Sequence, residues 1–377
     1  MTVPETLETE YGRLLRKAGL SRDELSDLSS TLDIGDRLED FISAHGSQGL
    51  DLSGLADPVR QMRDHPFLAG ASQGVLRCVL TNIEASATVC NLRIPYPLYA
   101  GEFPTYEING CIVPARNGAL ILINSGLIFL LHHISDILAS FAISNVPRSG
   151  NAWPNVGVDR NSQELTTLCL GNALLAYLSF DLKERPARPR VPGFFQWVVS
   201  RLVWQETVHF VLAHEVAHAI RGHLEVPQAS PQQEFEADET GLFLVRRQPI
   251  RPEGLDSELV KLIEHARFAA PFFFFSFCTL VDHVLAVPVV RCVYEMQSRQ
   301  EYLPVSYRYA RAEKAGATHP PASGRLEAIQ RLIGDCGTKL PLALAYFSAM
   351  SKLEADTVKL VQTWCERVLN EARTSQD

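Results

Sequence analysis

The sequence predicts an α+β fold that is mostly helical, with a small β-sheet or hairpin. Most of the chain reads as helices, and two short candidate strands, residues 106–113 and 119–124, flank Asn117-Gly118, a strong hairpin-turn signal. With 377 residues, 46% of them hydrophobic and 21% charged, the chain can bury a sizeable core as one large domain or two.

The N-terminal part of the chain is expected to be helical. Residues 1–60 look polar and helical, as a small appended domain or a partner-binding arm, and residues 66–92 look like a further helix. Three prolines then mark a loop: Pro95, Pro97 and Pro104. After the first strand, the apolar residues 119–143 are expected to form a buried strand that leads into a helix.

An insertion is expected at about residues 142–195. Its flanks are residues 145–163, rich in Gly, Pro, Asn and Arg, and residues 183–193, a basic proline-rich linker, with a helix around residues 164–180 between them. An exposed linker is the plain interpretation of the basic flank, and a docking site or cleavable lid is the alternative. A long helix is then expected over residues 194–222, followed by a helical C-terminal third.

The stretch from His214 to His218 reads His-Glu-Val-Ala-His within an apolar run, and it is the most specific pattern in the chain. Residues four apart lie on the same face of a helix, so both imidazoles can direct one nitrogen at a single metal ion. Glu215 is rotated by about 100° from His214, where it can accept a proton from water beside such an ion. This is the arrangement that zinc hydrolysis requires. The alternative is a buried helix whose histidines make ordinary hydrogen bonds.

A third ligand is expected on the helix that follows. Residues 230–233, Ser-Pro-Gln-Gln, have the spacing of an N-cap, a first helical position and a capping box. On that helix Glu234 and Asp238 share one face, whereas Glu236 is about 200° away from Glu234. We assign Glu234 to the metal, and Asp238 to the second ring N–H of a ligand histidine. The alternative is a solvated acidic helix face.

A metzincin motif is excluded. That motif places its third histidine at the position of Leu224, and its glycine is also displaced in this chain. Gly222 and His223 are expected instead to close the helix, with a cation-capable side chain near its C-terminus.

Several stretches of the chain occur together, in the same order, in one known group. They are Asn117 to Leu127, the ten residues His-Glu-Val-Ala-His-Ala-Ile-Arg-Gly-His from His214, Glu-Phe-Glu-Ala-Asp from Glu234, and Thr318-His319-Pro320-Pro321 followed by Arg325-Leu326. Together they resemble the gluzincin metalloproteases of the HtpX and CAAX-prenyl-protease type. The resemblance spans roughly residues 105–332, with gaps.

The resemblance implies a zincin-like peptidase domain over residues 61–377. Carried over by position, it implies three zinc ligands: His214, His218 and Glu234. It also implies Glu215 as the base, Asp238 behind the ligands, and His319 in contact with the oxyanion or the substrate.

The chain departs from the family in two places. The stretch between His218 and Glu234 is shorter than in the membrane-bound members, and the insertion precedes the metal helix. These departures favour a divergent, soluble relative. Cytosolic peptidases of the phage-exclusion (Lit-like) type, which share the zinc helix, are a neighbouring possibility.

Composition narrows the class of protein further. A net charge of −8 argues against general nucleic-acid binding. The eight cysteines contain no C-x-x-C pair and read as thiols in a reducing compartment, and residues 1–10 lack the apolar region of a signal peptide, so a cytoplasmic location is expected. Residues 268–290 form an apolar run, but Asp282-His283 and Pro288 lie within it, which favours a core helix over a membrane span.

The sequence therefore predicts a zinc-dependent endopeptidase that acts on a protein or peptide substrate, with Glu215 as general base, as a regulatory intracellular protease. In zincins an edge strand near the metal helix receives the substrate by β-addition, and one of the two predicted strands is the candidate. The alternative is a zinc-binding sensor or scaffold with latent or no proteolysis. Residues 1–60 and the insertion would then contact a regulatory protein partner.

Overall fold

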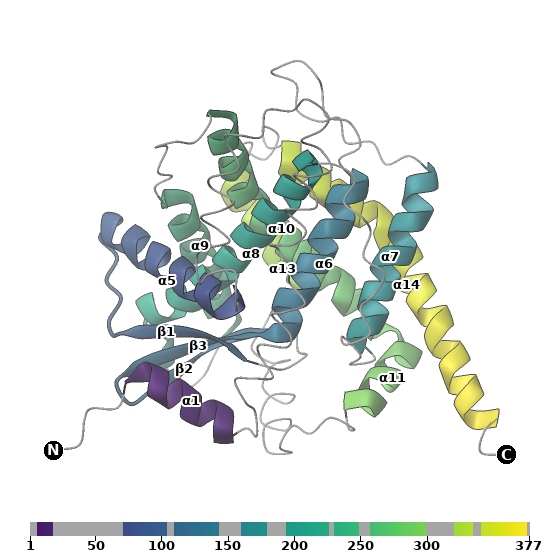
Figure 1. The fold of residues 1–377 in the computed structure, drawn as a ribbon, viewed down its shortest axis with the longest axis horizontal. Coiled ribbons are helices and arrows are strands. Elements are labelled where there is room, and N and C mark those ends of the chain that lie inside the picture. The colour runs from purple at the N-terminus through teal and green to yellow at the C-terminus, as the bar shows by residue number, and fades with distance from the viewer. Residues whose placement is uncertain are drawn as a thin grey trace.

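The structure is a computed structural model with a mostly helical α+β fold and a small three-stranded sheet (Figure 1). It describes residues 6–17, 71–103, 109–142, 160–178, 194–225, 230–248, 257–298, 320–334 and 341–374. The helices are α1 (Leu7–Lys17), α5 (Ala71–Val89), α6 (Ser125–Ala142), α7 (Arg160–Leu178), α8 (Phe194–Ile220), α9 (Pro231–Arg247), α10 (Ser257–Ala286), α11 (Pro288–Ser298), α13 (Ala322–Ile333) and α14 (Pro341–Thr374), with a short 3-10 helix, η1 (His223–Glu225). The strands are β1 (Leu98–Phe103), β2 (Gly110–Ala115) and β3 (Gly118–Asn124).

The predicted hairpin is confirmed, with its turn shifted by one residue. β2 and β3 pair antiparallel, and Ala115 pairs with Gly118, so Arg116 and Asn117 form the two-residue loop. β3 continues directly into α6, as expected for an apolar strand that leads into a helix. Long helices also form where α7, α8 and α9 were predicted, whereas both flanks of the insertion (145–159 and 183–193) lie outside the described residues.

The sheet has a third strand that the sequence did not indicate. β1 pairs parallel with β3, which places β3 in the centre of the order β1-β3-β2. The expectation of a loop around Pro95, Pro97 and Pro104 was wrong here. Pro97 immediately precedes β1, so it removes no hydrogen-bond donor from the strand, whereas Pro104 lies outside the described residues.

The sheet is covered on both faces. Ala100, Ile121 and Ile123 belong to the main core with α5 and α8, whereas Phe103 and Leu120 point the other way, toward α1. α1 therefore packs on the face of the sheet opposite α5, as Figure 1 shows. The remaining residues of the predicted N-terminal segment, apart from 6–17, lie outside the described residues.

α10 contacts α8, α13 and α14, and its apolar residues contribute to the main core. The stretch Val260–Ala286 is long and apolar enough to cross a membrane by length and composition, and 56% of its apolar 18-residue window is buried in the structure. Asp282 accepts a hydrogen bond from the backbone N–H of Ala322, the first residue of α13. The N-cap residue of α13, Pro321, makes no side-chain capping hydrogen bond. Asp282 therefore supplies an acceptor for the first backbone N–H of this helix.

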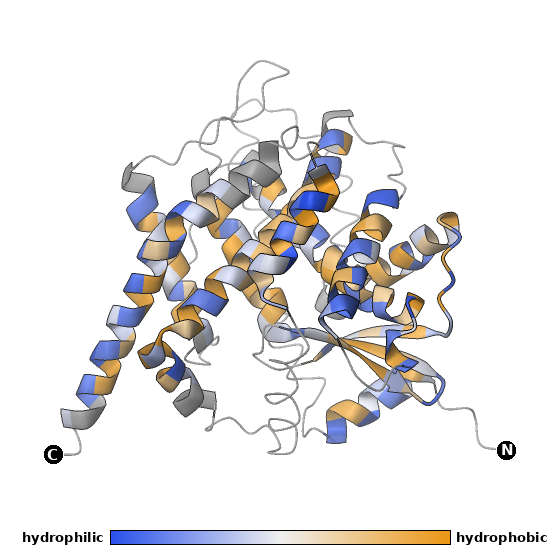
Figure 2. Ribbon diagram, turned by 180° about the vertical axis from the view of Figure 1, so that it is seen from behind, coloured by the Kyte–Doolittle hydropathy of each residue, from blue (hydrophilic) through white to orange (hydrophobic). Residues whose placement is uncertain are grey.

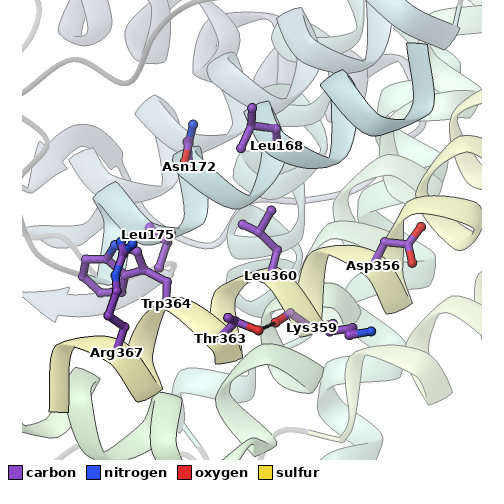
Figure 3. Close-up of a pocket in the computed structure, with 9 residues that line it drawn as sticks. All are labelled: Leu168, Asn172, Leu175, Asp356, Lys359, Leu360, Thr363, Trp364 and Arg367. Atoms are coloured by element: carbon purple, nitrogen blue, oxygen red, sulfur yellow. Dashed lines mark hydrogen bonds between the residues drawn. The ribbon is translucent and has the colours of Figure 1, made fainter. Parts of the chain in front are cut away.

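Hydrophobic residues lie mainly where the helices pack against each other, and α14, which ends at the C-terminus, alternates hydrophilic and hydrophobic residues along its length (Figure 2). A groove lies between α7 and α14 (Figure 3). Its lining combines leucines, among them Leu168 and Leu360, with the charged Lys359 and Arg367. None of its lining residues belongs to the predicted zinc site, so this groove is separate from that site.

Candidate metal centre

α8 and α9 pack closely and run antiparallel. Gly241 lies against the backbone of His214: a Cβ at position 241 would be 2.9 Å from the nitrogen of His214 and 3.1 Å from its Cα. Toward the other end of the contact, Glu234 at the start of α9 lies near His218 on α8. The capping box predicted for residues 230–233 is confirmed, and it fixes the helical turn that carries Glu234.

Replacing Gly241 with alanine is expected to lower stability by about 1–3 kcal/mol and to weaken metal binding, because the added methyl group meets backbone atoms that cannot rotate away. Denaturant unfolding and zinc titration measure the two effects. Gly324→Ala is the matched control, since a Cβ there meets no atom within 4 Å. If Gly241→Ala behaved like this control, the close contact of the two helices would be refuted.

His214, His218 and Glu234 meet at one point between α8 and α9, where their ligand atoms all lie within 4.8 Å of one another. The Nε2 atoms of the two histidines are 3.1 Å apart, and they lie 3.5 and 3.7 Å from the carboxylate oxygens of Glu234. Ligand atoms bound at about 2.0–2.1 Å around a tetrahedral ion are about 3.3–3.4 Å apart. The two nitrogens and the two carboxylate oxygens of Glu234 therefore lie at distances close to those found around one divalent ion. Two imidazole nitrogens and a carboxylate suit several first-row divalent ions, zinc among them.

The second ring nitrogen of His214 faces Asp238. Its Nδ1 lies 2.9 Å from Oδ1 of Asp238, which is 2% exposed. A carboxylate in this position accepts the Nδ1–H and leaves Nε2 as the nitrogen that faces a metal. Thus the structure brings together all four residues that the sequence placed in and directly behind the ligand set.

Arg325 of α13 joins the centre, although the sequence indicated it only as part of a family motif. Its guanidinium donates to both carboxylate oxygens of Asp238, at 2.7 and 2.6 Å, and lies 3.2 Å from Glu234. The ring of Phe275 packs against it, with 4.8 Å from the guanidinium carbon to the ring centroid. This two-pronged contact fixes the orientation of Asp238, and so of His214, more firmly than a lysine ammonium would.

The electrostatic environments of the two histidines differ. Burial alone would lower the pKa of His214, but hydrogen bonds with Asp238 and Glu234 raise this pKa to about 9. Burial and the adjacent His214 lower the pKa of His218 to about 3. Burial raises the pKa of Asp238, but Arg325 and His214 outweigh it and hold this pKa below its usual value. His218 is therefore neutral, with a nitrogen lone pair available to a metal. The positive charge of the histidine pair lies on His214.

Glu215 is buried, with 7% of its surface exposed, and faces the first residue of β2. A Cβ added at Gly110 would lie 3.4 Å from Oε1 of Glu215. The glycine therefore leaves room beside this carboxylate, at the point where the sheet meets the metal helix.

His319 lies outside the described residues, as does Thr318. The structure resumes at Pro320, directly before α13. The contact of His319 with an oxyanion or substrate stays a prediction.

No protein-family model, curated protein or solved structure matches the chain. The site is defined by its own geometry, as a buried group of two histidines and a glutamate that could hold a metal ion between two antiparallel helices.

Proposed function

We propose that the protein is a zinc-dependent endopeptidase with a zincin-like core, a divergent relative of the gluzincins of the HtpX and CAAX-prenyl-protease type. The convergence of His214, His218 and Glu234, with Glu215 on the same helix as the two histidines, carries this proposal. A zinc ion held there supplies Lewis acidity, which lowers the pKa of water and polarises the scissile carbonyl. Glu215 takes the proton from the attacking water and delivers it to the leaving amine.

The position of β2 supports a peptide substrate. Within the described residues the sheet order is β1-β3-β2, so β2 pairs with β3 on one side only. Pro114 fits such an edge, since a proline removes a backbone donor that a central strand would need. An extended peptide can add to an edge strand through its backbone, and Gly110 at the start of β2 would place it beside Glu215.

We further propose that the enzyme acts on a protein or peptide inside the cell. No disulfide joins the cysteines in the described part of the chain, which suits a reducing compartment. A regulatory partner would bind through residues 1–60 or the insertion at about residues 142–195.

Metal removal is expected to abolish hydrolysis, and added zinc is expected to restore it, because the water-activating group is lost and regained. The full chain is purified, its bound metal is quantified, and cleavage of a proteome-derived peptide library is followed by mass spectrometry before chelation, after chelation and after zinc addition. Cleavage that survives complete removal of the metal would contradict the proposal. A chain that binds zinc but cuts neither peptides nor host proteins would favour the sensor or scaffold alternative.

A further inference from the structure

His218 has a second ring nitrogen that faces away from the candidate metal centre. Its Nδ1 lies 2.9 Å from Nδ1 of His223. At this distance one of the two nitrogens donates a hydrogen bond and the other accepts it. The chain brings the two rings together through Gly222, whose left-handed backbone (φ +72°) ends α8 and turns η1 back toward His218. The ring centroids of the two histidines are 5.0 Å apart.

The other nitrogen of His223 identifies the donor. Nε2 of His223 lies 3.2 Å from Oε2 of Glu236, and an ionised carboxylate only accepts hydrogen bonds. In the form of His223 that has one ring hydrogen, Nε2 therefore carries this hydrogen toward Glu236, and Nδ1 is an acceptor. His218 then carries its hydrogen on Nδ1, and its Nε2 keeps the lone pair that faces Glu234 and the candidate ion. Gln232 donates to the other oxygen of Glu236 at 3.2 Å and holds this carboxylate in place.

We infer that His223 and Glu236 position the metal ligand His218. α9 then supports the whole centre: Glu234 faces the candidate ion site, Asp238 orients His214 directly, and Glu236 orients His218 through His223. Glu236 lies on a different face of the helix from Glu234, as the sequence indicated. His223 lies between Glu236 and His218 and contacts both. His223 thus has a more specific environment than the helix-closing cation that the sequence predicted.

The two carboxylates that orient the histidines, Asp238 and Glu236, differ in how strongly they are held. Asp238 is buried and paired with Arg325, whereas 38% of the Glu236 side chain is exposed and its charge is partly screened by solvent. The side chain of His223 is 7% exposed. We therefore expect His223, which has the less exposed side chain, to matter more than Glu236.

This inference rests on the proposed metal centre and does not require peptidase activity. Its test is zinc affinity, measured by competition with a chromophoric chelator on the full chain. His223→Leu is expected to bind zinc about 10- to 100-fold more weakly, because it removes the acceptor of the His218 Nδ1–H. His223→Asn, which can present an amide oxygen near the position of Nδ1, is expected to recover most of the affinity, and Glu236→Ala is expected to lose less than His223→Leu. Glu239→Ala, at an exposed position of α9, is the control.

Thermal unfolding of the metal-free variants separates positioning from structural damage. A positioning role leaves the unfolding temperature of metal-free His223→Leu close to that of His223→Asn, although their zinc affinities differ. Equal affinities for wild type and His223→Leu, equal losses in the leucine and asparagine variants, or a wild-type chain that binds no zinc would overturn the inference. Zinc binding that depends on His223 in a chain without peptidase activity would support it and would count only against the proposed function.

Discussion

Replacing Glu215 with glutamine is expected to lower peptide hydrolysis by about 10²- to 10⁴-fold while zinc binding stays at the wild-type level. Glutamine has nearly the same size and shape, so it should fit the buried position between α8 and the start of β2. Its amide cannot take a proton from water, so only the base is removed. His214, His218 and Glu234 are untouched.

Zinc content and cleavage are therefore measured on the same preparation. The substrate comes from a comparison in the native host, where peptides cut by the wild type and not by Glu215→Gln are identified by proteomics. Glu239→Gln removes an exposed carboxylate from α9 and should cleave like the wild type. Normal cleavage by Glu215→Gln would refute its assignment as the base.

The parts of the centre that sequence analysis anticipated depend on local rules. The spacing of His214 and His218 requires only the geometry of a helix, and the capping box at residues 230–233 is a signal within four residues. The face shared by Glu234 and Asp238 follows from the same helical period. Each of these features is encoded over about one or two turns of helix, so one sequence suffices to predict it.

The features of the fold and the centre that could not be predicted from the sequence depend on tertiary contacts. Arg325 lies 87 residues after Asp238, and no local pattern says which carboxylate it will meet. The strand β1 exists because β3 lies beside it in parallel, a pairing that its own six residues do not specify. His223 looked like the end of a helix because its partner Glu236 reaches it only after the chain has reversed direction.

Replacing Arg325 with alanine is expected to destabilise the metal-free protein by about 3–5 kcal/mol. The guanidinium compensates two buried carboxylates, Asp238 and Glu234, which are 2% and 5% exposed. Removing it leaves both charges in a poorly solvated environment, where an uncompensated charge costs more than the ion pair contributes. The pKa of Asp238 is expected to rise, since Arg325 is the main cause that lowers it.

Zinc should reduce this loss. A divalent ion beside Glu234 supplies positive charge close to the one that Arg325→Ala removes, so the zinc-loaded variant is expected to lose less stability than the metal-free variant. Denaturant unfolding with and without zinc measures both values. Arg331→Ala, at an exposed position of the same helix, should stay within about 0.5 kcal/mol of the wild type in both conditions.

Arg325→Lys distinguishes charge from geometry. Lysine keeps the positive charge but cannot donate to both oxygens of Asp238 in one plane, so we expect intermediate stability and weaker orientation of His214. A loss of less than about 1 kcal/mol in the metal-free alanine variant would contradict this role of Arg325. Another group would then compensate the buried charges of Asp238 and Glu234.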